Sequence, residues 1–126
     1  MAVVGVGVDA IEIDRVELAL ARTPALVDRL FTGAEQAHCT KRAGRRRAAR
    51  FAGRFAAKEA VAKALGTGVV GFGFRDIEVL SDGDGAPRVV LADAARRTAA
   101  RAGVARVHVS LSLTTTVAVA SAVAES

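Results

Sequence analysis

The first residues of the chain alternate between two kinds of side chain. Over residues 2–9 the valines at positions 4, 6 and 8 fall on one face of an extended segment, whereas Gly5, Gly7 and Asp9 fall on the other. This pattern predicts a buried strand. Because interior glycines weaken a strand unless something packs close against the backbone, we expect a helix to cross the glycine face. Asp9 would then lie at the edge of that contact, with no partner of its own nearby.

Helical spacing dominates the next part of the sequence. Thr32 and Glu35 match a capping box, so one helix is expected to begin there. The run Arg45–Arg47 is either a mobile loop or the first turn of a longer helix. The predicted helices cover residues 12–22, a short stretch that ends at Leu30, a segment that begins at Thr32, residues 46–65 and residues 92–102.

The strongest helix is the one predicted over residues 46–65, which ends at Gly66. Phe51, Phe55 and Glu59 follow one another at a spacing of four residues, so they lie on one face of this helix. The carboxylate of Glu59 is therefore expected to emerge where the apolar face ends. Arg50, Arg54 and Lys58 form a parallel basic stripe on the same helix.

Strand signals return in the second half of the chain. The predicted strands cover residues 75–80, 88–91, 106–113 and 117–124, and the turn-rich segment 82–87 joins the first two. Helices mixed with hairpin-like strand pairs indicate an α+β fold, with a mainly antiparallel sheet and a long central helix. A length of 126 residues without repeats or a linker predicts a single domain over residues 1–126.

The charge of the chain narrows the classes of partner. The net charge is +5 and the sequence pI is about 10.6, which favours an anionic partner such as nucleic acid, a phosphorylated small molecule or an acidic protein. The arginine-rich region 45–54 lacks aromatic residues on which bases would stack, so nucleic-acid binding is the weaker alternative.

Cysteine usage and hydropathy indicate a compartment. Cys39 is the only cysteine, so no internal disulfide forms and a reducing environment is expected. The N-terminus lacks the basic start of a signal peptide, and no segment reaches the roughly 20 apolar residues of a membrane helix. A cytoplasmic protein without a membrane partner is the resulting expectation.

A glycine pattern over residues 66–71 matches GxGxxG but favours no dinucleotide site. That site needs a strand before the glycines and a helix after them, whereas here a predicted helix precedes them. His38 and His108 have no partners at metal-ligand spacing, so a structural role is expected for both.

Asp9 and Glu59 are the strongest candidates for chemistry. One interpretation of Glu59 is a helical ion pair with Lys63, which would stabilise the helix by a few tenths of a kcal/mol. If the alanine-rich helix crosses the glycine face of the first strand, however, Asp9 and Glu59 converge. Mg²⁺ is typically held by one or two carboxylates together with substrate phosphates, and Lys63 and Arg54 would then face those phosphates. This predicts a small enzyme that acts on a phosphate ester.

The motifs also resemble a known family, the holo-acyl-carrier-protein synthases among the 4′-phosphopantetheinyl transferases. The resemblance covers essentially the whole chain, and its most specific part is the third of four segments. These segments are Gly5–Glu12, Phe31–Glu35, Arg54–Gly68 and Val109–Ser112.

The resemblance implies an activity and a fold. The expected fold is that of a 4′-phosphopantetheinyl transferase, and the expected reaction is Mg²⁺-dependent transfer of 4′-phosphopantetheine from coenzyme A, the co-substrate, to a serine of an apo acyl carrier protein. Adenosine 3′,5′-bisphosphate would be released. Short members of the family are homotrimers with interfacial active sites. The type of carrier protein, from fatty-acid or polyketide biosynthesis, stays open.

Several residues match positions with roles in that family. Asp9 and Glu59 match its Mg²⁺ ligands, and Lys63 joins them in the catalytic group. Other matches are implied contacts of coenzyme A at Arg54, Lys63, Gly66, Thr67 and Pro87, and contacts of the carrier protein at Arg15 and Arg22. The general base is not identified.

The last motif departs from the family at Leu113. The family usually has histidine there, whereas the parity of Leu113 with Val109 and Leu111 also fits an ordinary core position. Loss of the imidazole removes a possible phosphate contact, which the hydroxyl groups of Thr114–Thr116 could replace. Two alternative functions therefore stay open: a degenerate coenzyme-binding subunit without turnover, and a basic nucleic-acid-binding module.

Overall fold

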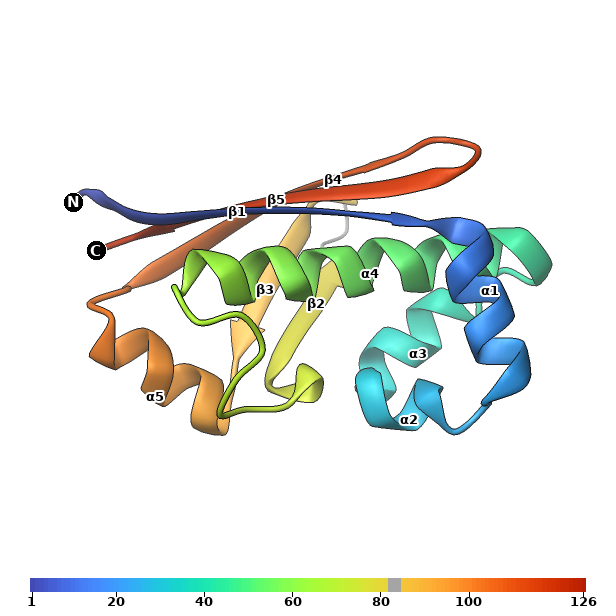
Figure 1. The fold of residues 1–126 in the computed structure, drawn as a ribbon, viewed down its shortest axis with the longest axis horizontal. Helices are drawn as coiled ribbons and strands as arrows, with labels where there is room; N and C mark the ends of the chain where they lie inside the picture. Colours follow the sequence, from blue (N-terminus) through green and yellow to red (C-terminus); the bar gives the residue numbers. More distant parts are fainter. Residues whose placement is uncertain (82–84) are drawn as a thin grey trace.

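A computed structural model describes residues 1–81 and 85–126 (Figure 1). The expected turn over residues 82–87 lies partly outside the described residues, because positions 82–84 are not among them. The strands are β1 (Val3–Glu12), β2 (Ile77–Ser81), β3 (Pro87–Leu91), β4 (Arg106–Leu113) and β5 (Val117–Glu125). The helices are α1 (Ile13–Arg22), α2 (Leu26–Leu30), α3 (Gly33–Cys39), α4 (Gly44–Ala64), the 3₁₀ turn η1 (Phe74–Asp76) and α5 (Asp93–Arg101).

The fold consists of a three-stranded sheet that packs on the long helix α4, and a separate two-stranded sheet. The order of the larger sheet is β1-β5-β4, and β2 pairs with β3; every pairing in the described chain is antiparallel. Helix α4 runs along the larger sheet in Figure 1. The predicted α+β class, with an antiparallel sheet and a long central helix, is confirmed.

The two glycines of β1 allow α4 to lie very close to the sheet. A Cβ atom on Gly5 would overlap the carbonyl oxygen of Ala64, and one on Gly7 would overlap that of Ala60. Any larger side chain would push the helix away from the strand. The prediction that a helix crosses the glycine face of the first strand is therefore confirmed.

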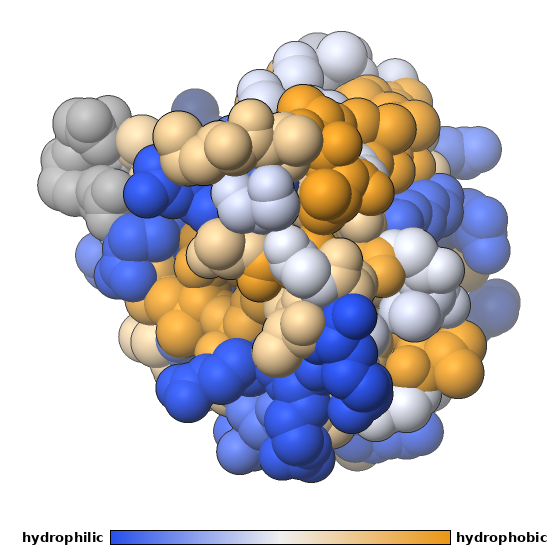
Figure 2. Space-filling view, turned by 90° about the vertical axis from the view of Figure 1, so that its left-hand side faces the viewer, coloured by the Kyte–Doolittle hydropathy of each residue, from blue (hydrophilic) through white to orange (hydrophobic). Residues whose placement is uncertain are grey.

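The prediction that the first strand is buried was wrong for its valine face. Val4, Val6 and Val8 are 47%, 66% and 61% exposed in the single chain. The strand is also longer than predicted, since it extends to Glu12. Figure 2 looks onto the end of the molecule that carries both termini and shows hydrophobic residues gathered on its upper part, above hydrophilic ones. Apolar alternation thus identified a face that the described part of the chain leaves largely exposed.

Most other predicted elements were placed correctly. The Thr32–Glu35 capping box opens α3, with the backbone N–H of Thr32 donating to Glu35 Oε1 at 2.8 Å. The arginine run belongs to the first turns of α4, which settles its two open alternatives in favour of helix. The strand predicted over residues 75–80 instead begins at Ile77, after η1. No helix in the described chain is both long and apolar enough to cross a membrane.

Candidate active site

Asp9 and Lys63 are held together where β1 meets α4. Lys63 Nζ donates to the carbonyl oxygen of Val8 at 2.9 Å and lies 3.4 Å from Asp9 Oδ1. Because the helix crosses the glycine face of β1, a side chain near its C-terminal end reaches the strand two residues beyond Gly7. The partner of Asp9 is thus not local in the sequence: Lys63, 54 residues later, supplies it.

Glu59 lies one helical turn before Lys63 and near Asp9. Burial raises the pKa of the Glu59 carboxyl above its ordinary value, the negative charge of Asp9 raises it further, and the positive charge of Lys63 lowers it. Phe51 is fully buried and Phe55 partly so, and Glu59, which follows Phe55 on that helical face, is charged and only partly buried. The predicted emergence of its carboxylate at the end of the apolar face is therefore confirmed.

The donor chemistry of this cluster fits a hard divalent cation. Two carboxylates whose charges repel each other, with a raised pKa on one of them, favour a bound cation over two separate anions. A group of three or more His, Cys, Asp or Glu side chains able to enclose a metal is absent from the described residues. Two carboxylates leave most coordination positions for oxygen atoms from elsewhere, which suits Mg²⁺ bound together with a phosphate-bearing ligand.

The cluster opens toward the free edge of β1. A cavity of about 340 Å³ is lined by residues Val6–Val8 and by Lys63. Strand β1 is an outer strand of its sheet, so its outer edge is not covered by another strand of the described chain. A ligand or a second subunit can therefore approach Lys63 from this side.

Asp9, Glu59 and Lys63 form a first group of predicted site residues. The loop that follows α4 adds two more residues to this group. The backbone N–H of Gly66 donates to the carbonyl oxygen of Lys63 at 2.9 Å, and Gly66 has a φ of 88°, which glycine adopts readily. Thr67 is exposed beside it, and its hydroxyl donates to the carbonyl oxygen of Gly68 at 2.7 Å. Gly66 and Thr67 thus lie at the helix end that carries Lys63.

Arg54 on α4 and Pro87 at the start of β3 form a second group, which Ser81 links. Arg54 is only 6% exposed, and its Nη2 donates to Ser81 Oγ at 3.2 Å. Ser81 is the register partner of Pro87 in the small sheet. The Nε of Arg54 is buried without a hydrogen-bond partner among the described residues. A single chain therefore brings the predicted coenzyme contacts together as two groups.

The predicted partner residues lie on α1. Arg15 and Arg22 are both exposed. Arg15 borders a mostly apolar cavity of about 220 Å³ between α1 and α2, whose lining includes Leu30, Phe31 and Phe55. This cavity was not foreseen, because its walls come from three helices that the sequence does not place relative to one another.

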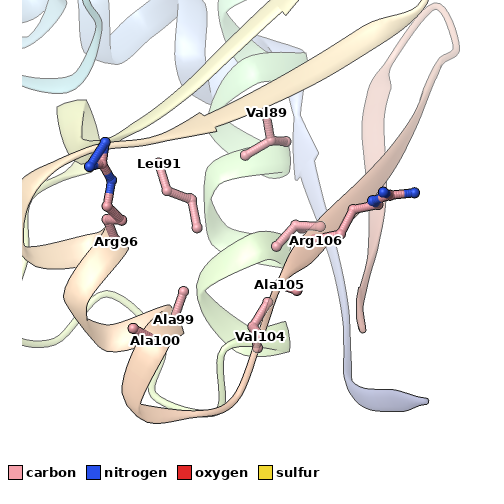
Figure 3. A pocket seen from close by; sticks show the side chains of 9 residues that line it. Val89, Leu91, Arg96, Ala99, Ala100, Val104, Ala105 and Arg106 are labelled. Carbon is pink, nitrogen blue, oxygen red and sulfur yellow. The ribbon is translucent and has the colours of Figure 1, made fainter. Parts of the chain in front are cut away.

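A larger cavity lies away from the carboxylates. Its volume is about 350 Å³, and it lies between β3, α5 and the start of β4 (Figure 3). Val89, Leu91, Val104 and Val107 form most of its apolar wall. In Figure 3 the guanidinium group of Arg106 turns away from it.

Sequence analysis missed one buried pair, Glu35 with Lys58. Lys58 Nζ lies 2.8 Å from Glu35 Oε1, and both side chains have no exposed surface. Glu35 was interpreted only as part of a cap and Lys58 only as part of a basic stripe. Their separation by 23 residues gives no local signal of contact.

Comparison with known proteins agrees with these features. A model of the 4′-phosphopantetheinyl transferase superfamily matches residues 5–120. The holo-acyl-carrier-protein synthase of Moorella thermoacetica is 47% identical over 122 residues, which is 95% of this chain and 92% of the relative. That of Frankia casuarinae is 46% identical over 125 residues, which is 99% of both chains.

Solved structures show the same likeness. A crystal structure of a holo-acyl-carrier-protein synthase from Bacillus anthracis in complex with coenzyme A (3′,5′-ADP) has a TM-score of 0.83 and 37% identity. The match covers 98% of this chain and 97% of that one. The similarity therefore extends over nearly the full length of both chains.

Proposed function

The chain belongs to the 4′-phosphopantetheinyl transferase superfamily, and we propose that it transfers 4′-phosphopantetheine from coenzyme A to a serine of an apo acyl carrier protein. The convergence of Asp9, Glu59 and Lys63 at the open edge of β1 carries this proposal. These side chains come from a strand and a helix about 50 residues apart, and together they match the chemistry of a pyrophosphate substrate.

Asp9 and Glu59 would hold Mg²⁺, which would neutralise pyrophosphate charge when bound. Each carboxylate offers oxygen ligands. Burial, and after it the negative charge of Asp9, raises the pKa of the Glu59 carboxyl, and a bound divalent cation would offset that repulsion. Lys63 uses two of its ammonium protons on Val8 and Asp9, and a third can donate to a phosphate oxygen. Its charge is thereby fixed beside the carboxylates.

The reaction is a displacement at phosphorus. The serine oxygen of the carrier protein forms a bond to the phosphorus that bears the pantetheine arm, while the bond from that phosphorus to the bridging oxygen breaks. Adenosine 3′,5′-bisphosphate leaves with the bridging oxygen. The serine proton passes to a base, either a carboxylate directly or a water molecule held by one. Lys63 and Arg54 favour the reaction by binding and orienting the phosphates.

Arg54 and Pro87 are proposed to contact the nucleotide part of the coenzyme. The buried Nε of Arg54 has no partner in the described chain, which supports a missing acceptor such as a phosphate oxygen. Pro87 lies across the sheet from the serine to which Arg54 donates. Gly66 and Thr67 would line the coenzyme from the end of α4.

The carrier protein is proposed to dock on α1. Exposed Arg15 and Arg22 provide positive charge, and the apolar cavity beside Arg15 can receive an apolar side chain at the centre of the contact. A net charge of +5 would steer an acidic partner toward this surface.

A homotrimer with active sites between subunits is also proposed. The exposed valine face of β1 is the kind of apolar surface that an interface covers. It adjoins the cavity next to Lys63, so a neighbouring subunit could complete the coenzyme site there. This would unite the two groups of predicted coenzyme contacts, with each site using residues from two chains.

The experiment that tests the proposal is a mass measurement. An apo carrier protein is incubated with this chain, coenzyme A and Mg²⁺, and its intact mass is recorded. We expect the mass of the carrier protein to increase by one phosphopantetheine group, with adenosine 3′,5′-bisphosphate as the second product. Coenzyme binding without any change in carrier mass would contradict it and favour a degenerate coenzyme-binding subunit.

A further inference from the structure

Strand β2 has a free edge that two buried side chains fill. Within the described chain β2 pairs only with β3, so its other edge presents backbone groups that no strand satisfies. The N–H of Val79 donates to Glu35 Oε2 at 2.9 Å. The carbonyl oxygen of Ile77 accepts from Lys58 Nζ at 2.6 Å. Glu35 and Lys58 thus make the hydrogen bonds that a neighbouring strand would otherwise make.

The pair is saturated with hydrogen bonds. The three protons of Lys58 Nζ go to Glu35 Oε1 at 2.8 Å, to the carbonyl oxygen of Phe74 at 2.9 Å and to that of Ile77. Glu35 Oε1 also accepts from the backbone N–H of Thr32. One pair therefore connects α3 and α4 with η1 and β2, which come later in the sequence.

Two more side-chain contacts fasten the same strand. Thr32 Oγ1 donates to Glu78 Oε2 at 2.5 Å, and Arg54 donates to Ser81. Strand β2 is therefore attached to α3 and α4 by side chains along its length, and the described chain shows no backbone pairing of β2 with the larger sheet. The position of the small sheet depends on polar groups whose hydrogen bonds have direction.

We propose that Glu35 and Lys58 are positioning residues for the coenzyme site, because they hold the β2–β3 sheet against α4 in the pose that binds coenzyme A. The inference rests on the proposed function, since that function gives Pro87 and Arg54 their coenzyme contacts. Pro87 begins β3, and Arg54 lies one helical turn before Lys58. A shift of β2 would displace both contacts.

Energetics support positioning over stabilisation as the role of the pair. Burying two charges costs several kcal/mol, so apolar replacement of a buried ion pair is often neutral or stabilising. Apolar side chains, however, offer nothing to the N–H of Val79 or to the carbonyl oxygens of Phe74 and Ile77. The charges of the pair thus add little net stability, whereas its hydrogen bonds to these backbone groups fix where the small sheet lies, and their loss lowers the stability as well.

The test uses the double variant E35L/K58M in the full chain. The variant is expected to unfold cooperatively at a lower temperature than wild type, because backbone groups of η1 and β2 lose their partners, while amide exchange over Ile77–Ser81 accelerates and the Kd for coenzyme A rises. Both changes should be at least about tenfold, the size typical of groups that support a binding site from behind. At saturating coenzyme, the KM for the carrier protein should stay at its wild-type value, because neither member of the pair hydrogen-bonds to α1 in the described chain.

The matched control removes another ion pair from α4. Arg45 bonds Asp14 and the carbonyl oxygen of Thr115 at the opposite end of the helix. The double variant D14N/R45Q should leave exchange in β2 and the coenzyme Kd unchanged. Wild-type exchange in β2 and wild-type coenzyme affinity in E35L/K58M would overturn the proposal.

Measurements on the wild-type protein decide the proposal in two further cases. If the variant does not fold, the amide of Val79 decides: it should be protected as strongly as the core amides of α4, and free exchange at this sheet edge would overturn the proposal. If wild-type protein binds coenzyme A but modifies no carrier protein, the proposed function fails, whereas exchange and coenzyme affinity still decide the positioning role.

Discussion

Glu59 and Lys63 lie one turn apart on α4, and each changes the electrostatics of the other. The positive charge of Lys63 lowers the pKa of Glu59, but burial and Asp9 raise it by more, so the net shift is upward. Lys63 bonds β1 and Asp9 and thereby ties the helix to the strand. The ion-pair interpretation of Glu59 and Lys63 therefore captures only part of their interaction.

Leu113 departs from its predicted core position. It is 49% exposed, because it ends β4 and faces α4 only near Gly53. We predict that Leu113→His tightens binding of coenzyme A, since an imidazole can donate to a phosphate oxygen. Calorimetric titration with coenzyme A measures the change, and Leu18→His on α1, a position that is also 49% exposed, serves as control. Equal affinity in both variants would show that position 113 is not limiting.

Cys39 is predicted to be unreactive in the folded protein. It is fully buried, and burial raises the pKa of its thiol to about 11. At pH 8, three units lower, roughly one thiol in a thousand would be ionised. Iodoacetamide at pH 8 should therefore modify the native chain slowly and the guanidinium-unfolded chain quickly, as followed by mass spectrometry. Complete labelling of the native chain at the unfolded rate would contradict this.

The contact between β1 and α4 is the element-level feature on which the site depends. Gly5 and Gly7 let the helix carbonyls of Ala64 and Ala60 approach the strand backbone. Without that approach, Lys63 could not reach Val8 and Asp9. The proposed metal site thus depends on two residues that carry no functional group.

Gly7→Ala is predicted to lower the free energy of unfolding by about 3 kcal/mol, because its Cβ would overlap the carbonyl oxygen of Ala60 and force the helix outward. Chemical denaturation measures the change. The control is Gly33→Ala, where a Cβ meets nothing within 4 Å and where the first turn of α3 tolerates alanine. Similar stabilities of the two variants would mean that β1 and α4 are not in tight contact.

Local sequence patterns predicted the helices and strands well, but predicted only part of how they pack against one another. Two sequence features were sufficient to place the carboxylates together, because each identifies one face of its strand or helix. They are the alternation of glycines in β1 and the four-residue spacing of Phe51, Phe55 and Glu59 in α4. The roles of Glu35 and Lys58 could not be predicted, because they depend on where β2 docks. The alternation of apolar residues in β1 likewise does not distinguish a strand face that is buried in the core from one that is buried between two chains.

The chain as a whole carries a net positive charge and exposes an apolar face on β1. Positive charge favours an anionic partner, and exposed valines on β1 favour a second copy of the chain. Burial of Arg54 and Lys58 removes two cations from the surface stripe that nucleic-acid binding would use. The nucleic-acid alternative is weaker for that reason.

Val6→Asp is predicted to dissociate the assembly and reduce turnover, because it places a charge in the proposed interface. Light scattering after size-exclusion chromatography should change from three times the 13.0 kDa of one chain to a single chain. The control is Val70→Asp, since Val70 is 69% exposed, close to the 66% of Val6, but lies in the loop after α4. A monomeric wild-type protein with full activity would contradict the proposed trimer.

Asp9 and Glu59 are proposed to bind the Mg²⁺ that transfer requires, and the Glu59→Gln variant removes one of these two carboxylates while keeping the size of the side chain. Intact-mass measurement follows modification of an apo carrier protein by the variant and by wild type, with Mg²⁺ and with excess chelator. We expect wild type to transfer only with Mg²⁺. With Mg²⁺ the variant should transfer at least about a hundredfold more slowly than wild type, while circular dichroism shows an unchanged fold. Near-normal, Mg²⁺-dependent turnover by the Glu59→Gln variant would contradict the account.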